Sequence, residues 1–183
     1  MKRSPGWLAA VLAALSAPAE SSAQAAIHIA AGVTVPTGEY SEYAKSGWIT
    51  QAGYSAPVGE AGLALGGEVF FGRNNHEPPP DENKSYLYGA TGIVRYAYGD
   101  TDEVYPFVFG MAGLLAESFR SDAQPGLNGS AAKLAVGAGA GVGFPAGDMT
   151  GYVNAWFLNG FGSEADTRLF GVTTGLRLPL DGF

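Results

Sequence analysis

Residues 132–145 read AKLAVGAGAGVGFP, and larger apolar residues alternate with small or polar ones along most of this stretch. Leu134, Val136, Val142 and Phe144 fall on one face of such a strand, while Lys133 and the glycines fall on the other. Successive side chains of a β-strand point to opposite faces, so this alternation predicts a strand with two different surroundings. The glycine run has a strict period of two, unlike a phosphate-binding loop, and it predicts a strand face that admits bulky neighbours.

The same kind of alternation recurs along the rest of the chain. The expected strands cover residues 27–35, 48–57, 62–72, 85–98, 104–116, 132–145, 150–160 and 168–180. Long polar connections at 36–47, 73–84, 117–131 and 161–167 alternate with short turns at 58–61, 99–103 and 146–149. Small outer-membrane barrels have short turns in the periplasm and longer loops outside. We therefore predict an all-β fold: an eight-stranded, antiparallel, up-and-down transmembrane β-barrel whose first strand runs outward.

The first residues have the pattern of an export signal. Lys2 and Arg3 precede an apolar segment at residues 7–15, and Ala23-Gln24-Ala25 forms a small-x-small cleavage site. We predict a cleaved signal peptide at residues 1–25 and an outer-membrane barrel domain at residues 26–183. The apolar segment is too short to span a bilayer as a helix. The chain has no Cys, so we expect no disulfide, no lipidated cysteine and no thiolate metal site.

Charge excludes one class of partner. Lys2, Arg3 and Glu20 precede the expected cleavage site, which leaves 8 of the 10 basic and 16 of the 17 acidic residues and a net charge of −8. This acidic balance argues against nucleic acid. The expected partners are outer-membrane lipid, lipopolysaccharide and, during insertion, the barrel-assembly machinery, together with an external partner that the sequence does not identify.

No cofactor or metal is expected. The loop HEPPPDEN at residues 76–83 carries an imidazole and carboxylates, but its three consecutive prolines keep it extended, so we expect a solvated loop rather than a cation site.

Alternation alone does not distinguish a membrane barrel from a soluble one such as a lipocalin. A water-facing strand surface would be dense in Lys, Glu, Ser and Thr, whereas the second face here is mostly Gly and Ala with single polar residues. A narrow interior filled by side chains requires that mixture, so the membrane barrel is favoured. The polar side chains expected to face the lumen are His28, Gln51, Glu68, Arg95, Lys133 and Arg177.

Aromatic residues cluster near the ends of the expected strands, as in the girdles at the two membrane interfaces. The expected outer girdle is formed by Trp48, Phe71, Tyr86, Tyr88 and Phe170, and the periplasmic girdle by Tyr96, Tyr98, Tyr105, Phe107 and Phe144. In the fifth strand this prediction places Tyr105, Phe107, Phe109 and Met111 on the lipid face. The faces of the seventh strand stay ambiguous, because Tyr152, Trp156 and Leu158 share a face with Asn154.

The C-terminal strand has one irregular feature. Its lipid face continues through Leu176, Leu178 and Leu180, while Phe183 is out of phase and follows the turn-like pair Asp181-Gly182. Two alternatives remain open: a strand that ends at Leu180 with a short tail, which we favour, or a bulge that brings Phe183 into phase.

Three segments resemble small outer-membrane barrels of the OmpX/OmpW-like superfamily: IHIAAGVTVPTGE at 27–39, the glycine ladder ending in GFP at 143–145, and TGLRL at 174–178. The resemblance implies the fold and the location, and it implies no specific function. Relatives often carry charged residues on the lumen face of the penultimate strand, where this chain has Asn154 and Trp156.

An enzyme requires a nucleophile with a positioned base. The only two histidines, His28 and His76, are expected near opposite ends of the barrel and cannot share a site. We expect a non-enzymatic protein with a structural or surface-interaction role through acidic loops. The alternative is a narrow porin-like channel, or a conduit for small apolar molecules, with Glu68, Arg95 and Arg177 as selectivity groups. Eight strands leave an interior just filled by side chains, which favours the first reading.

Overall fold

The computed structural model describes residues 25–59, 62–76, 83–99, 103–121, 126, 128–162 and 166–180. The expected signal peptide, apart from Ala25, therefore lies outside the described residues, and so does Phe183. The same holds for parts of the connections expected at 58–61, 73–84, 99–103, 117–131 and 161–167.

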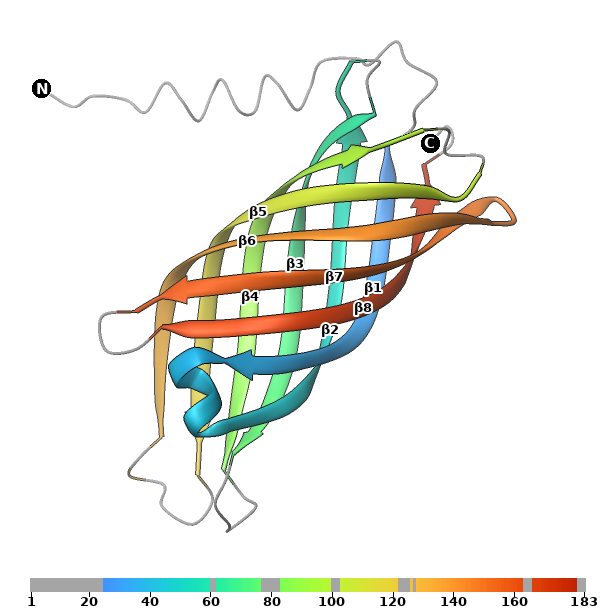
Figure 1. The fold of residues 1–183 in the computed structure, drawn as a ribbon. Helices are drawn as coiled ribbons and strands as arrows, with labels where there is room; N and C mark the ends of the chain where they lie inside the picture. The colour runs from blue at the N-terminus through green and yellow to red at the C-terminus, as the bar shows by residue number, and fades with distance from the viewer. Residues whose placement is uncertain are drawn as a thin grey trace, which may run out of the picture.

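Eight antiparallel strands, hydrogen-bonded in sequence order, close into one barrel, which confirms the predicted fold (Figure 1). The strands are β1 (Ala26–Thr37), β2 (Ala44–Pro57), β3 (Leu63–His76), β4 (Lys84–Ala97), β5 (Tyr105–Arg120), β6 (Gly129–Ala146), β7 (Met149–Phe161) and β8 (Thr167–Pro179). A short 3-10 helix, η1 (Gly38–Glu42), connects β1 to β2. Among the described residues, no helix has the length and apolar character needed to cross a bilayer.

Several strands are longer than expected at the end that carries η1. β2 already begins at Ala44, β3 continues to His76, β5 continues to Arg120, and β6 already begins at Gly129. Polar residues there were expected in loops, but their backbones stay in the ladder, as in the pairing of Lys84 with Arg120. A strand end is set by where pairing stops, so a polar side chain alone does not end a strand.

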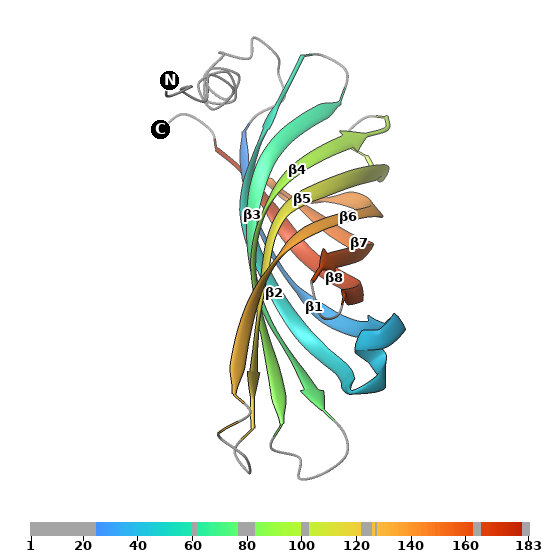
Figure 2. The ribbon, with the colours of Figure 1, turned by 90° about the vertical axis from the view of Figure 1, so that its left-hand side faces the viewer.

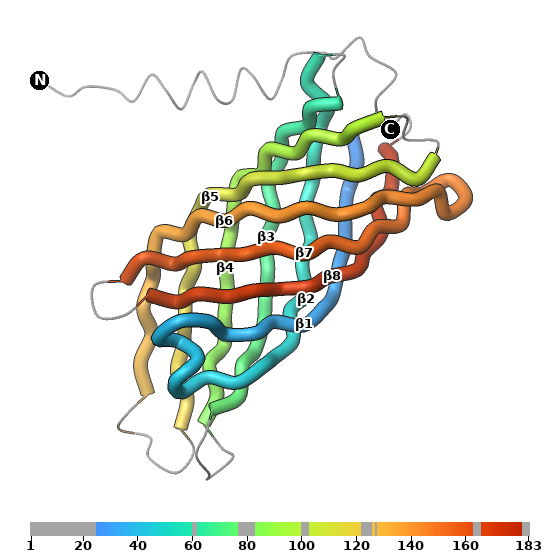
Figure 3. Tube along the Cα trace, in the orientation of Figure 1, coloured from blue at the N-terminus to red at the C-terminus, as the bar shows by residue number. Residues whose placement is uncertain are grey.

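The opposite end of the barrel carries the short connections, the beginning of β1 and the end of β8 (Figures 1 and 3). β6 and β7 are joined by two residues, Gly147 and Asp148, with Gly147 at φ +67°. A two-residue hairpin turn of this kind requires a positive φ, which glycine adopts without strain. Beyond the last ladder pair of β1 and β8, the Leu180 N–H donates to the Ala25 carbonyl at 2.8 Å.

The register of the ladders determines how strongly the strands tilt. Starting at Ala26 and moving from partner to partner around the barrel, the path returns to β1 at Pro36, ten residues further along; it passes Ser55, Gly66, Ile93, Met111, Gly137, Leu158 and Leu169. A stagger of ten residues in eight strands corresponds to a tilt of about 40°. Figure 2 shows the resulting slant and coiling of the strands. At this strand number the interior is narrow enough to be filled by side chains.

The outer surface is an apolar belt. Large apolar side chains between about 37 and 69% exposed project from all the strands; they include Ile29, Val33, Val69, Val94, Val108, Leu114, Leu134, Val136, Val142, Val153, Phe157, Val172, Leu176 and Leu178. The opposite faces of the same strands supply the buried residues of the interior. A surface this apolar has a favourable environment in a bilayer and an unfavourable one in water.

The orientation of β5 is the reverse of the prediction. Tyr105, Phe107 and Met111 are 1, 3 and 6% exposed and face the interior with Phe109, while Val108 lies outside. The expected placement of Tyr105 and Phe107 in the periplasmic girdle is therefore wrong. The physical reason is the register, which pairs these rings with the glycine face of β6 and so provides room inside for them.

The structure also shows which face of β7 lies inside, which the sequence left ambiguous. Tyr152, Trp156 and Leu158 face the interior together with Asn154, and Val153 and Phe157 face outward. Tyr152 and Trp156 pair with Gly175 and Gly171 of β8, where an added Cβ atom would meet the rings.

Candidate functional site in the barrel interior

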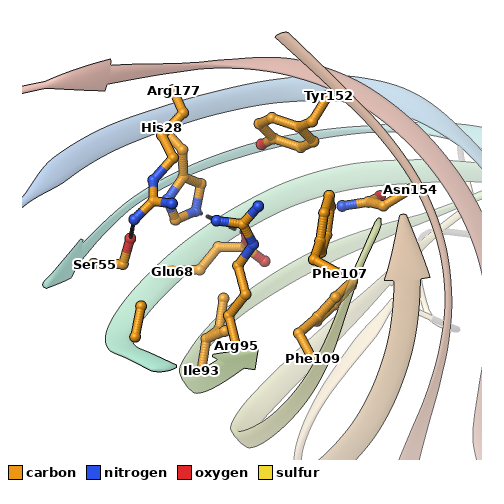
Figure 4. Close-up of a pocket in the computed structure, with 11 residues that line it drawn as sticks. His28, Ser55, Glu68, Ile93, Arg95, Phe107, Phe109, Tyr152, Asn154 and Arg177 are labelled. Atoms are coloured by element: carbon orange, nitrogen blue, oxygen red, sulfur yellow. Dashed lines mark hydrogen bonds and ion pairs between the residues drawn. The ribbon is translucent and has the colours of Figure 1, made fainter. Parts of the chain in front are cut away.

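The structure places the six polar residues expected in the lumen on the interior face of their strands. Five of them, His28, Gln51, Glu68, Arg95 and Arg177, lie in the half of the barrel nearer the short turns. Figure 4 shows all of these except Gln51. They come from β1, β2, β3, β4 and β8. Lys133 of β6 lies apart from them, toward the end that carries η1.

Glu68 is held by two neighbours. Gln51 Nε2 donates to Glu68 Oε1 at 2.9 Å, and His28 Nε2 lies 3.1 Å from Glu68 Oε2. The side chains of His28 and Glu68 are 12 and 8% exposed. A carboxylate that is removed from water needs such partners, because an unpaired charge in an interior is costly.

The two arginines are held by hydroxyl groups and by an aromatic ring rather than by a carboxylate. Arg95 Nη2 donates to the Tyr105 hydroxyl at 3.2 Å, and its guanidinium lies 4.1 Å from the centre of the Phe107 ring. Arg177 Nη2 donates to Ser55 Oγ at 3.0 Å. Figure 4 shows both guanidiniums directed into the same space beside Glu68.

These groups line a cavity of about 60 Å³, which we call the short-turn chamber. Its polar lining consists of His28, Ser55, Glu68, Arg95, Asn154 and Arg177. Its remaining wall is mainly apolar and aromatic: Ala64, Ile93, Phe107, Phe109 and Tyr152. A space of this size holds a few water molecules or one small ion.

A packed apolar layer occupies the interior beyond the chamber. Its largest members are buried to 6% exposure or less: Ile49, Phe70, Leu87, Met111, Leu115, Trp156, Leu158 and Leu169. Side chains packed this closely leave no room for a column of water. The lumen at this height is therefore filled by side chains.

A second polar cluster, the outer cluster, lies on the far side of the apolar layer and is centred on Glu117. Ser85 Oγ and Thr167 Oγ1 each donate to the Glu117 carboxylate at 2.9 Å, and Lys133 Nζ lies 3.4 Å from it. Lys133 also donates to Thr167 Oγ1 at 2.6 Å. Glu117 was expected in a loop, and that placement is wrong because β5 continues past it. Residue 117 is in phase with the odd-numbered interior face of β5, but both faces of this strand are apolar, so no local pattern in the sequence pointed to it.

His76 belongs to the same outer cluster and is not a loop residue as expected. Its Nε2 lies 2.8 Å from Ser85 Oγ, and its side chain is packed inside the end of β3. Burial lowers the pKa of His76, and the negative charge of Glu117 opposes this shift only in part. Burial, together with the same carboxylate, raises the pKa of the Tyr40 hydroxyl in η1 well above its usual range.

The pairing of a serine with a histidine resembles part of a hydrolytic site, but the geometry differs. In a nucleophile–base pair the serine proton goes to the imidazole, and a third group orients that imidazole. Here Ser85 donates its proton to Glu117, and Ser85 is fully buried at 0% exposure. The arrangement is that of an interior hydrogen-bond network.

The remaining aromatic residues of the expected girdles lie on the outer surface. Phe71 contacts Trp48 and Tyr88, each with ring centres 5.3 Å apart, and stacks on Tyr86 at 6.2 Å. Near the short turns, Tyr96 and Tyr98 pack edge to face at 4.7 Å. Phe144 and Phe170 are 38 and 41% exposed. Tyr54, 43% exposed near the short turns, was missed by the sequence analysis.

The described residues contain no group of three or more His, Asp or Glu side chains arranged to hold a metal ion.

Comparison with known proteins shows the fold. No known protein family matches the sequence, and no curated protein matches it. Among solved structures, Neisserial surface protein A (NspA) is similar over 85% of this chain and 97% of its own, with a TM-score of 0.66 and 13% identity. The crystal structure of Ail, the attachment invasion locus protein of Yersinia pestis, is similar over 86% and 100%, with a TM-score of 0.51 and 14% identity. Ail in a phospholipid bilayer nanodisc is similar over 85% and 99%, with a TM-score of 0.50 and 16% identity. The chain thus has the fold of the small eight-stranded outer-membrane barrels.

Proposed function

We propose that this protein is an integral outer-membrane surface protein with a closed lumen, which contacts external partners or supports the envelope without enzymatic activity. In this proposal residues 1–25 direct export and are removed, and the apolar belt contacts lipid and lipopolysaccharide. The short turns lie in the periplasm, and η1 lies outside the cell.

The apolar layer carries the proposal. A conducting barrel needs a continuous polar path, whereas Phe70, Leu87 and Trp156 are packed across this interior at 6, 0 and 3% exposure. The apolar belt supports the membrane location, since lipid-facing positions of such barrels are apolar. With the lumen closed, the surface that remains for an external partner is the end that carries η1.

The solved structures support the surface role. Two of the similar solved structures are those of a Neisserial surface protein and of an attachment invasion locus protein. At the η1 end of this chain, Glu39 and Glu42 are exposed, as expected for an acidic contact surface. The complementary partner would carry positive charge.

The absence of an accessible nucleophile–base pair in the described part of the chain supports a non-enzymatic role. The pair that comes nearest, Ser85 with His76, is buried within the outer cluster. A substrate in the membrane or in water has no contact with the Ser85 hydroxyl, which is 0% exposed.

Single cysteines test the orientation, because the natural chain has none. Glu42→Cys places a thiol on η1, and Asp148→Cys places one in the β6–β7 turn; both sites are exposed. We expect a membrane-impermeant maleimide to label Glu42→Cys on intact cells and Asp148→Cys only after the outer membrane is permeabilised. The reverse pattern would overturn the orientation, and labelling in the soluble periplasmic fraction would overturn the membrane location.

Planar-bilayer recording tests the closed lumen against the channel alternative. We expect the wild-type barrel to insert without discrete conductance steps over the range of applied voltages. Steps whose ion selectivity changes on Glu68→Gln or Arg95→Gln, and not on the exposed control Glu39→Gln, would establish a porin-like channel instead.

A further inference from the structure

We propose that the short-turn chamber is a binding site for a small oxyanion, a phosphate or carboxylate group held between Arg95 and Arg177. This site is separate from the external contact surface proposed above.

The charges of the chamber are unbalanced in favour of an anion. Glu68 is the one carboxylate in its lining, and its two oxygen atoms already face Gln51 and His28. Among the described residues, neither Arg95 nor Arg177 lies within ion-pair distance of a carboxylate. Two guanidiniums in a narrow interior are costly to keep there unless an anion or water compensates them.

The donors of the chamber are preorganised. A guanidinium has five N–H donors in a fixed plane, and it binds an oxyanion best through two parallel hydrogen bonds. Arg95 donates one hydrogen bond to the Tyr105 hydroxyl and lies against the Phe107 ring, while Arg177 donates one to Ser55. These contacts fix the two side chains, so that their remaining donors face the shared space seen in Figure 4.

Size and access define the class of ligand. The cavity of about 60 Å³ takes one phosphate or carboxylate group in place of a few water molecules, so any substituent on that group has to extend out of the chamber. The apolar layer, which includes Phe70 and Trp156, blocks entry from the η1 end. A ligand therefore enters from the short-turn end, which faces the periplasm in the proposed orientation.

Calorimetric titration of inorganic phosphate into the full barrel in detergent micelles tests the site, with sodium chloride adjusted to hold the ionic strength constant. We expect saturable binding of one phosphate by wild type, and binding about tenfold weaker in Arg95→Gln and in Arg177→Gln, because each change removes charge-assisted hydrogen bonds. The matched control is Arg168→Gln, an exposed arginine of β8 outside the chamber, which we expect to bind phosphate as wild type does.

Two further measurements distinguish phosphate binding by Arg95 and Arg177 from a purely structural role of these two side chains. Arg95→Lys and Arg177→Lys keep the charge without the planar fork, so we expect binding between that of wild type and the Gln variants. In the wild-type protein, the guanidinium N–H resonances of both arginines should shift with phosphate along the calorimetric isotherm. Acetate is titrated in the same way, to represent a carboxylate ligand. Absence of saturable binding of both phosphate and acetate, or equal binding in the Arg95, Arg177 and Arg168 variants, would overturn the proposal.

Competition distinguishes the source of the phosphate group. Displacement by glycerol 3-phosphate alone identifies a soluble ligand. Displacement by a short-chain phosphatidylglycerol as well identifies a lipid headgroup, and either result supports the oxyanion site.

Discussion

Tyr105 of β5 lies opposite Gly143 of β6, and its ring covers the position that a Cβ atom on residue 143 would occupy. The same relationship joins Phe107 to Gly141 and Phe109 to Gly139. The glycine face of β6 is thus the surface on which the β5 rings lie. Because the Tyr105 hydroxyl accepts a hydrogen bond from Arg95, this packing also positions one side of the short-turn chamber.

We expect Gly143→Val to destabilise the barrel by about 1–3 kcal/mol, because the new side chain overlaps the Tyr105 ring. Combining it with Tyr105→Leu should cost less than the sum of the two single changes, since the ring that causes the overlap is gone. The measurement is the free energy of unfolding in urea for the full double-mutant cycle in lipid vesicles. The control Ala140→Val lies on the outer face of β6 and should change little. Strict additivity at residues 105 and 143 would contradict the packing.

Val136→Arg should cost about 2–4 kcal/mol in lipid vesicles, because Val136 is 48% exposed on the apolar belt and an arginine there meets hydrocarbon. The same substitution at Ser130, on the same face of β6 but at its outer end, should cost much less, since the penalty falls toward the interface. Gly137→Arg faces inward against Met111 and should prevent folding by overlap. Equal unfolding midpoints for wild type and Val136→Arg would show that this face does not contact lipid.

The lowered pKa of His76 predicts a pH dependence of stability. In the unfolded chain His76 takes up a proton near pH 6.5, whereas in the folded protein it does so only at lower pH. Its contribution is therefore fully present above pH 6.5 and is lost as the pH falls through the pKa of the folded state. We expect the unfolding free energy of wild type to decrease more than that of His76→Gln between pH 7.5 and pH 5. Parallel pH profiles would show that burial of the imidazole has no energetic effect.

Outer-membrane barrels that this chain resembles usually close on a C-terminal strand that serves as the signal for assembly, and the end of β8 predicts which residues form that signal here. Leu176 and Leu178 are exposed on the outer face. The backbone hydrogen bond from Leu180 to Ala25 extends the contact between β8 and β1, the two strands that close the barrel. We expect deletion of residues 181–183 to leave insertion intact, and Leu178→Ser combined with Leu180→Ser to leave the protein in the periplasm. Fractionation and the difference in gel migration before and after boiling are the readouts. The opposite outcome would identify Phe183 as the signal.

Most of the architecture could be read from the sequence because the surroundings of a barrel strand repeat every two residues. Alternation, long and short connections and the glycine ladder predicted eight strands in up-and-down order, and they predicted the faces of β1, β3, β6 and β8 as the structure has them. The lumen positions of Glu68, Arg95 and Arg177 followed from the same alternation of side chains along each strand.

Only the tertiary structure decided which face of a strand lies inside where both faces are apolar, and which distant residues meet in the lumen. Both faces of β5 are apolar, so the pairing of Tyr105 with Gly143 determined which face is inside. Pairing between strands likewise extended β5 past Glu117 and brought Glu117 to Ser85, which is 32 residues away in the chain. Arg95 and Arg177 come from strands that are not neighbours in the sheet, and they share one cavity only because the barrel closes. Local patterning sets the face of a strand where its two sides differ in polarity, whereas contacts across the lumen depend on register and closure, which no local pattern encodes.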